Sequence, residues 1–217
     1  MITILSDNSK EVARLLLEIK AVSFQFDPPF TYTTGLRSPI YLDNRLVMSY
    51  PDVRKKICAF YADRVRDIWG DVDVISATAT GAIPMGAWLA DELGLPLVFV
   101  RGSAKGHGKG NQMEGVLKKN QKVLIVEDHI STGASALENA RVIGDNGGVV
   151  VGCIGTTSYE TEVSKKNFER SDVRLEYLVS GKQIVEQAVA EDILSDQEKE
   201  SVFDWFSDPT GWFDRQS

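Results

Sequence analysis

Residues 123–135, VLIVEDHISTGAS, join four apolar residues to two adjacent carboxylates and then to a run of small and hydroxyl residues. The apolar run predicts a buried strand of a parallel sheet, and the small residues after it predict a turn into a helix. Such a turn offers backbone N–H groups and a helix N-terminus, both of which bind anions. Two negative charges, Glu127 and Asp128, nevertheless stand directly before it. The segment therefore raises the question of why two negative charges precede a turn that suits anions.

Other short apolar runs in the chain are also continuous rather than alternating, as expected for strands buried on both faces. Helical patterns that end in glycine separate most of these runs. Repetition of strand, helix and strand predicts an α/β fold with a central, mainly parallel sheet and helices on both of its faces. The strands are predicted at 72–77, 95–100 and 148–155, with a candidate later strand at 173–180, and the helices at 83–94 and 135–148.

Amphipathic patterns at the two ends of the chain predict further helices. Between the first two, residues 28–45 mix β-branched and aromatic residues with Gly35 and Pro39, a composition typical of short antiparallel strands and turns. This segment is predicted to form a small N-terminal hood. The end helices are predicted at 7–22, 49–69, 182–194 and 195–206.

The length and composition of the chain suit one well-packed domain with a small appendage, because it has 217 residues of which 43% are hydrophobic. We see no internal repeat and no low-complexity segment. The prediction is a single domain, 1–217, with the hood at about 1–48, a core at about 49–180 and C-terminal helices at about 181–217.

The distribution of charge indicates a small anionic ligand rather than a nucleic acid. A formal net charge of -7 argues against a general nucleic-acid binder, since binding to a phosphate backbone depends on Lys and Arg. Residues 101–119, in contrast, carry five basic residues against the single acid Glu114. One basic segment therefore lies inside an acidic protein.

Cysteine usage and hydropathy predict a cytoplasmic protein. Cys58 and Cys153 are the two cysteines, without a CxxC pair or histidines at metal-ligand spacing, and we expect reduced, buried thiols. The N-terminus lacks the basic region of a signal peptide, and no apolar run approaches the roughly 20 residues of a membrane helix.

The turn in residues 129–135 has neither the GxxxxGK spacing of a P-loop nor the GxGxxG of a dinucleotide fold. Its glycine and hydroxyl groups suit a single phosphate. Taken alone, the turn is equally consistent with Ser and Thr residues that only cap the helix. The two acids favour a ligand, because carboxylates after a buried strand need donors or a cation, which ribose hydroxyls or Mg²⁺ supply. The predicted ligand is a ribose 5-phosphate.

The connection between the strands at 95–100 and 122–127 spans about twenty residues, with five glycines between 101 and 119. His107 lies there between Lys105 and Lys109. Such a loop suits a lid that closes on an anionic leaving group and neutralises its charge. The alternative is a solvated, charged loop without a catalytic role.

Four segments, in this order along the chain, resemble the type I phosphoribosyltransferases. Residues 123–135 are similar to the family's phosphoribosyl-diphosphate signature, and residues 100–115, VRGSAKGHGKGNQMEG, resemble the mobile catalytic loop of its orotate phosphoribosyltransferase branch. Residues 30–46 are similar to that branch's N-terminal substrate segment, and residues 76–96 to its other ligand-facing turn and following helix. The resemblance covers about residues 10–160, and the tail is less diagnostic.

The resemblance implies the type I phosphoribosyltransferase fold, with a hood and a flexible catalytic loop at 102–116. It also implies an enzyme that transfers the 5-phosphoribosyl group from 5-phosphoribosyl 1-diphosphate to orotate, giving orotidine 5'-monophosphate and diphosphate in pyrimidine biosynthesis. Mg²⁺ is the implied cofactor. The implied partners are these small molecules and a second copy of the chain, in a homodimer that shares the catalytic loop, without nucleic acid or membrane.

Position by position, the resemblance implies roles for individual residues. Where enterobacterial-type members have lysine, this chain has Thr33 and Gly102, so Arg37 is the candidate substitute donor to orotate. Mg²⁺ would be held mainly by the diphosphate, with Glu127 and Asp128 nearby. The implied catalytic residues are Lys105, His107 and Asp128; the phosphoribosyl-diphosphate residues are Arg101, Lys105, His107, Glu127, Asp128, His129, Ile130, Ser131, Thr132, Gly133, Ala134 and Ser135; and the orotate residues are Ser131, Arg37, Tyr41 and Thr80.

Two other functions compete with this one. A purine phosphoribosyltransferase would keep the fold and change the base. A regulatory sensor of phosphoribosyl diphosphate would bind nucleic acid without catalysis, but the net charge of -7 speaks against it, as do Lys105 and His107.

Overall fold

The computed structural model describes residues 7–102 and 112–216, and the chain divides into two compact units. The first unit consists of Met1–Tyr50 together with Val179–Ser217, and the second of Pro51–Leu178. The first therefore combines the two ends of the chain, and the second is the continuous middle. The proposed single-domain organisation of 1–217 stays a prediction.

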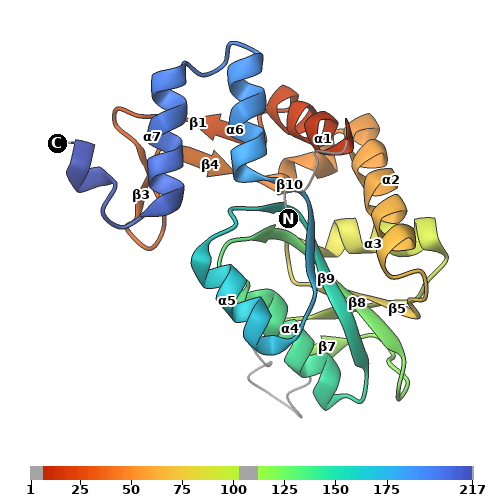
Figure 1. Ribbon diagram of the computed structural model, residues 1–217. Helices are drawn as coiled ribbons and strands as arrows, with labels where there is room; N and C mark the ends of the chain where they lie inside the picture. Colours follow the sequence, from red (N-terminus) through yellow and green to blue (C-terminus); the bar gives the residue numbers. More distant parts are fainter. Residues whose placement is uncertain (1–6, 103–111, 217) are drawn as a thin grey trace. The chain divides into compact units, whose positions relative to one another are not determined.

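A six-stranded sheet forms the centre of the second unit, with the strand order β10-β9-β8-β5-β6-β7 (Figure 1). The predicted parallel arrangement is confirmed, because β6, β5, β8 and β9 pair in parallel, whereas β7 pairs antiparallel with β6. The strands are β5 (Val74–Thr78), β6 (Leu97–Val100), β7 (Met113–Glu114), β8 (Lys122–Ile130), β9 (Val149–Ser158) and β10 (Leu175–Ser180).

Helices cover both faces of this sheet, as predicted (Figure 1). Successive residues of a strand point to opposite faces. Ser76 of β5 faces α4, because its hydroxyl donates to Asn139 at 2.7 Å. Ala77, the next residue of β5, faces α3, since a Cβ added to Gly86 would lie 2.8 Å from the Ala77 Cβ. Only glycine permits that close packing of α3 on β5. The helices are α2 (Pro51–Ile68), α3 (Ile83–Leu93), α4 (Ala134–Asp145) and α5 (Glu162–Ser171).

The core of the second unit consists of the apolar strand residues and the inward faces of the helices. Ile125, Ile130 and Phe168 pack in one cluster with Cys153, which is fully buried. Cys58 is also buried, and burial raises the pKa of its thiol to about 11. The predicted burial of both thiols is confirmed.

Two differences from the predicted elements matter for function. Strand β8 continues to Ile130 instead of ending at Glu127, because His129 and Ile130 still pair with Thr157 and Ser158 of β9. Helix α5 was not predicted from the sequence. Its segment has too few apolar residues for a helical stripe, and Val163 in it is 54% exposed.

The first unit joins two short two-stranded sheets to three α-helices. The predicted antiparallel strands of the hood are confirmed, since β1 pairs with β4 and β2 with β3. Helix α1 packs against α6, and α6 packs against α7. The elements are α1 (Asp7–Glu18), β1 (Val22–Phe24), β2 (Phe30–Thr31), β3 (Arg37–Ser38), β4 (Ile40–Leu42), η1 (Asn44–Ser49), α6 (Gly181–Ala190), α7 (Asp196–Ser207) and η2 (Phe213–Gln216).

No helix within residues 7–102 and 112–216 is both long and apolar enough to span a membrane.

Candidate active site

Two carboxylates lie near the carboxyl end of β8. Glu127 is buried, and its Oε1 accepts a hydrogen bond of 3.1 Å from the backbone N–H of Asp128. Its Oε2 is buried without a hydrogen-bond partner among the described residues. Burial raises the pKa of Glu127, and the adjacent Asp128 raises it further. A buried carboxyl without a full set of partners is a costly feature that a ligand with hydroxyl groups or a cation would relieve.

The turn that follows β5 lies beside these carboxylates, because β5 and β8 are neighbours and Ala77 is paired with Val126. A Cβ on Gly81 would lie 2.2 Å from Oδ2 of Asp128, so only glycine allows the turn to approach this closely. Thr80, the orotate candidate, is exposed in the same turn and follows a cis peptide bond. The fold thus brings the turn that contains Thr80 near Asp128, and the role of Thr80 in orotate binding stays a prediction.

A buried layer of polar side chains supports both strand ends. Asn139 of α4 donates to the Thr78 hydroxyl at 3.0 Å. The Tyr61 hydroxyl of α2 donates to the backbone carbonyl of Glu127 at 3.2 Å and lies 2.8 Å from the Thr156 hydroxyl. Both Asn139 and Tyr61 are fully buried. Asn139 thus holds the end of β5, and Tyr61 holds the acid-bearing end of β8.

The sequence analysis missed this layer. For Asn139 a signal existed, because the residue occupies the buried face of α4 together with Ala136 and Val142. A polar residue at an apolar position of an amphipathic helix usually bonds to a specific partner. Tyr61 gave no such signal, since tyrosine is common in helical core positions.

The residues after β8 form the turn that was predicted to hold phosphate. Gly133 has φ 79° and ψ 0°, a left-handed conformation that favours glycine, and it is the N-cap of α4. Gly133 has no side chain that could cap the helix, and the N–H of Ala134, the first residue of α4, donates to the Thr132 hydroxyl at 3.4 Å. The N–H groups that follow Ala134 in the first turn can still bind a ligand. Ser131, Thr132, Ala134 and Ser135 are exposed, whereas Ile130 and Gly133 are buried.

His129 packs into the protein rather than standing on the turn. Its Nδ1 lies 2.8 Å from the Thr157 hydroxyl, and its ring centroid lies 4.3 Å from that of Tyr159. Burial lowers the pKa of His129 to about 4, which keeps the imidazole neutral at physiological pH. Its place in the phosphoribosyl-diphosphate set stays a prediction, and the observed contacts are those of a packing residue.

The basic candidates follow β6. Arg101 forms an ion pair of 3.0 Å with Glu114 of β7, and its guanidinium lies 5.7 Å from the Phe99 ring centroid. Gly102, one of the two positions that depart from the resembled pattern, is exposed directly after it. Lys105 and His107 lie outside the described residues, so their predicted roles stay predictions.

The two carboxylates, Glu127 and Asp128, suit a metal ion that is held mainly by a substrate. Among the described side chains, no group of three or more His, Cys, Asp or Glu is placed to bind a metal. Mg²⁺ typically binds one or two carboxylates together with substrate phosphates and water. Glu127 and Asp128 can supply the carboxylates, and Glu127 has an oxygen without a partner in the described structure.

The remaining orotate candidates, Arg37 and Tyr41, belong to the first unit, whereas Thr80 and Ser131 belong to the second. The Arg37 guanidinium donates to the Thr31 hydroxyl at 2.7 Å and lies 5.2 Å from the ring centroid of Phe213. Tyr41 is 39% exposed, with its ring centroid 5.6 Å from that of Phe30. Thr33, the other departing position, is exposed in the β2–β3 turn.

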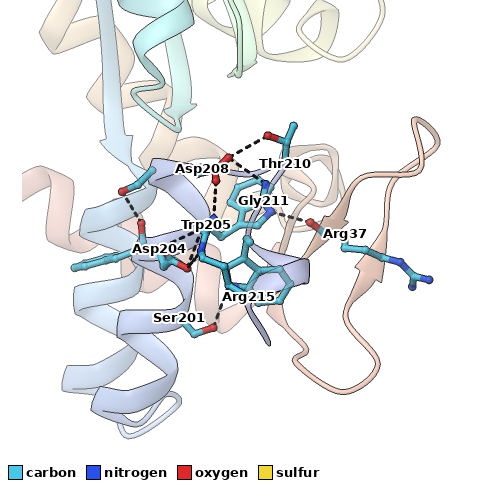
Figure 2. A network of polar contacts seen from close by, with 11 residues as sticks. Arg37, Ser201, Asp204, Trp205, Asp208, Thr210, Gly211 and Arg215 are labelled. Carbon is cyan, nitrogen blue, oxygen red and sulfur yellow. Dashed lines mark hydrogen bonds and ion pairs between the residues drawn. The ribbon is translucent and has the colours of Figure 1, made fainter. Parts of the chain in front are cut away.

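The C-terminal segment holds the backbone of Arg37. The indole N–H of Trp205 donates to the Arg37 carbonyl at 2.8 Å, while the Arg37 side chain extends away from Trp205 (Figure 2). Arg215 ties the segment after α7 back to that helix through ion pairs of 3.0 Å to Asp204 and 2.6 Å to Asp208. The Arg215 guanidinium lowers the pKa of Asp208 to about 2. Sequence analysis gave no role to this segment.

Comparisons with known proteins agree with this geometry. The family model "Phosphoribosyl transferase domain" matches residues 49–185. Orotate phosphoribosyltransferase of Listeria monocytogenes serotype 4b is 41% identical over 203 residues, covering 94% of this chain and 97% of the relative. Orotate phosphoribosyltransferase of Coxiella burnetii is 41% identical over 206 residues, covering 95% of this chain and 99% of the relative.

Solved structures give the same result. Orotate phosphoribosyltransferase from Aeropyrum pernix has a TM-score of 0.74 at 27% identity, covering 82% of this chain and 98% of its own. The Mycobacterium tuberculosis enzyme in complex with 5-phospho-alpha-D-ribosyl 1-diphosphate has a TM-score of 0.64 at 23% identity, with 82% of this chain and 98% of its own covered. The latter shows likeness of fold alone.

Proposed function

We propose a specific reaction for this chain, which belongs to the orotate phosphoribosyltransferase family and is therefore an enzyme of the phosphoribosyltransferase class. The predicted type I phosphoribosyltransferase fold is confirmed by the parallel sheet and by the structural neighbours. The proposed reaction is Mg²⁺-dependent transfer of the 5-phosphoribosyl group from 5-phosphoribosyl 1-diphosphate to N1 of orotate. The products are orotidine 5'-monophosphate and diphosphate.

The observation that carries this proposal is the order of groups along β8 and the turn after it. The two carboxylates come first, Asp128 and the buried Glu127, whose Oε2 has no partner among the described residues. The left-handed Gly133 at the start of α4 follows within six residues. Carboxylates bind ribose hydroxyls, and helix N-termini bind phosphate. One ligand with both groups, a ribose 5-phosphate, matches the two subsites.

In the proposed reaction, the bond between C1 of the ribose and the diphosphate oxygen breaks, and a bond from C1 to N1 of orotate forms. The proton of N1 is released to the departing diphosphate or to water. Positive charge develops on the ribose ring while the diphosphate leaves with the bonding electron pair. No side chain has to act as a nucleophile. Asp128 would face the ribose, and Arg101, Lys105 and His107 would stabilise the negative charge of the departing diphosphate.

The cofactor and the setting of the reaction are part of the proposal. Mg²⁺, when bound through the diphosphate with Glu127 and Asp128 nearby, would neutralise charge on the leaving group. We also propose that the enzyme acts in the cytoplasm in pyrimidine biosynthesis, as a homodimer that shares the catalytic loop. Resemblance to the family supports the homodimer, and sedimentation analysis tests it.

An absorbance assay tests the reaction. Protein, Mg²⁺, phosphoribosyl diphosphate and orotate are mixed, and the loss of orotate absorbance is followed. Parallel reactions replace orotate with hypoxanthine or adenine, because a purine phosphoribosyltransferase would use those bases instead. Consumption of orotate alone is the expected result. No consumption, with an active orotate phosphoribosyltransferase as a positive control, would refute the proposal.

A further inference from the structure

Helix α5 contacts the phosphate turn through side-chain donors. The Thr161 hydroxyl donates to the backbone carbonyl of Ser131 at 2.8 Å, and the Asn167 side-chain N–H donates to the carbonyl of Thr132 at 3.0 Å. Both carbonyls belong to the turn that follows β8. Two successive carbonyls of the turn are therefore held by a helix that comes about thirty residues later in the chain.

The Thr161 side chain also makes a second contact. Thr161 is the N-cap of α5, and its hydroxyl oxygen accepts a hydrogen bond of 3.1 Å from the backbone N–H of Ser164. A hydroxyl has one proton to give. That proton goes to Ser131, so the same side chain both starts α5 and holds the turn.

Phe168, from the same helix, packs against the turn. A Cβ on Gly133 would lie 2.4 Å from Cε2 of Phe168, and Phe168 is buried. The ring therefore packs directly against the Gly133 backbone. Three side chains of α5 contact three consecutive residues of the turn.

These contacts orient the N–H groups of the turn. The carbonyl of Ser131 and the N–H of Thr132 belong to one trans peptide unit, in which the two groups point in opposite directions. The same holds for the carbonyl of Thr132 and the N–H of Gly133. With both carbonyls directed at α5, the two N–H groups point away from it. Successive N–H groups on one side of a left-handed turn form an anion-binding concavity.

We infer that Thr161 and Asn167 are positioning residues for the 5-phosphate subsite, an inference that rests on the proposed function. By holding the carbonyls of Ser131 and Thr132, they turn two backbone donors toward the phosphate and keep two carbonyl oxygens away from it. Neither residue touches the substrate. Loss of either bond lets a carbonyl turn toward the anion, so binding of the sugar phosphate weakens.

The variants Asn167→Ala and Thr161→Val remove one bond each. Thr161→Ser retains the hydroxyl and should behave as wild type. Ser171→Ala is the matched control, because it removes a bond of the same type from α5, the 2.9 Å bond from the Ser171 hydroxyl to the Phe168 carbonyl, without touching the turn. Circular dichroism and thermal melting establish that each variant is folded.

The first measurement is the binding of ribose 5-phosphate by calorimetry, and the second is the KM of each substrate. Asn167→Ala and Thr161→Val are expected to weaken ribose 5-phosphate binding and to raise the KM for phosphoribosyl diphosphate by roughly three- to tenfold. The KM for orotate should change by less than that for phosphoribosyl diphosphate, because Ser131 is the one orotate candidate in this turn. The other three, Arg37, Tyr41 and Thr80, lie outside it. A purely structural role of α5 would change both KM values together.

The outcomes separate this inference from the proposed function. If folded variants bind ribose 5-phosphate as tightly as wild type, or if Ser171→Ala weakens binding equally, the positioning role is wrong. If wild type binds ribose 5-phosphate but does not consume orotate, the proposed reaction fails while the variants still decide the positioning role. If wild type consumes orotate but does not bind ribose 5-phosphate, the positioning role is overturned while the proposed reaction stands.

Discussion

Gly81 approaches Asp128 so closely that a Cβ on the glycine would lie 2.2 Å from Oδ2 of the carboxylate. Any side chain at position 81 must displace either the turn or Asp128. We therefore predict that Gly81→Ala raises the KM for phosphoribosyl diphosphate by at least about tenfold, as expected when a preorganised contact in an active site is misplaced. Steady-state kinetics with the second substrate saturating measure this effect.

The matched control for that variant is Gly144→Ala. Its added methyl group on α4 meets no atom within 4 Å, so its kinetics should equal those of wild type. An unchanged KM in Gly81→Ala would show that the closeness of the turn to Asp128 is not needed for binding.

Glu127 should destabilise the ligand-free protein at high pH. Burial and Asp128 raise its pKa in the folded protein, whereas in the unfolded chain it titrates near 4.5. Above that pH the unfolded chain loses the proton first, so the free energy of unfolding falls as pH rises toward the folded pKa. We predict that Glu127→Gln raises the melting temperature at pH 8 by at least about 2 °C, with no gain near pH 4.

Thermal melts from pH 4 to 9 without substrate measure this difference. Glu186→Gln, on the exposed side of α6, is the control. Its effect on the melting temperature should be small and should not depend on pH. A Glu127→Gln profile parallel to that of wild type would mean that the Glu127 pKa is not raised.

Trp205 should affect orotate more than phosphoribosyl diphosphate. Its indole N–H holds the Arg37 carbonyl at 2.8 Å, and Arg37 is the proposed donor to orotate. Trp205→Phe keeps most of the ring and removes the N–H. We predict that the KM for orotate rises roughly two- to tenfold, which is the effect of one lost hydrogen bond. The KM for phosphoribosyl diphosphate should stay within about twofold of the wild-type value.

Trp212→Phe provides the comparison in the same segment. It removes the 3.2 Å bond from the Trp212 indole to the Ser201 hydroxyl, which does not involve Arg37. Equal kinetics for the two variants would argue against a specific role of the Trp205 bond.

Lys105 should contribute to turnover more than to folding. Its proposed role is to stabilise the charge of the departing diphosphate, and removal of one such donor typically costs about a hundredfold to a thousandfold in rate. We predict that Lys105→Ala lowers kcat by at least roughly tenfold and leaves the melting temperature unchanged. Lys118→Ala, a change at an exposed lysine of the same basic segment, should leave kcat intact. An unimpaired Lys105→Ala enzyme would remove Lys105 from the mechanism.

Local patterns in the sequence were sufficient for most elements in the middle of the chain, namely α2, β5, α3, β6, β8, α4, β9 and β10. The run before Glu127 predicts a strand because a short, continuous apolar segment suits burial on both faces of a sheet. Gly133 and its neighbours predict the turn because a left-handed residue favours glycine. Helix α5 escaped prediction because Phe168 is its single buried large apolar residue, and one residue does not make a periodic pattern.

The sequence by itself therefore determined the strand, the acid pair and the phosphate turn, since each depends on neighbours along the chain. Only the tertiary structure decided which distant residues support them. Gly81 meets Asp128, Asn167 holds the Thr132 carbonyl, and Trp205 holds Arg37 across 168 positions. Such contacts depend on how packed elements align in three dimensions. A single donor or a missing Cβ leaves no periodic trace in the sequence.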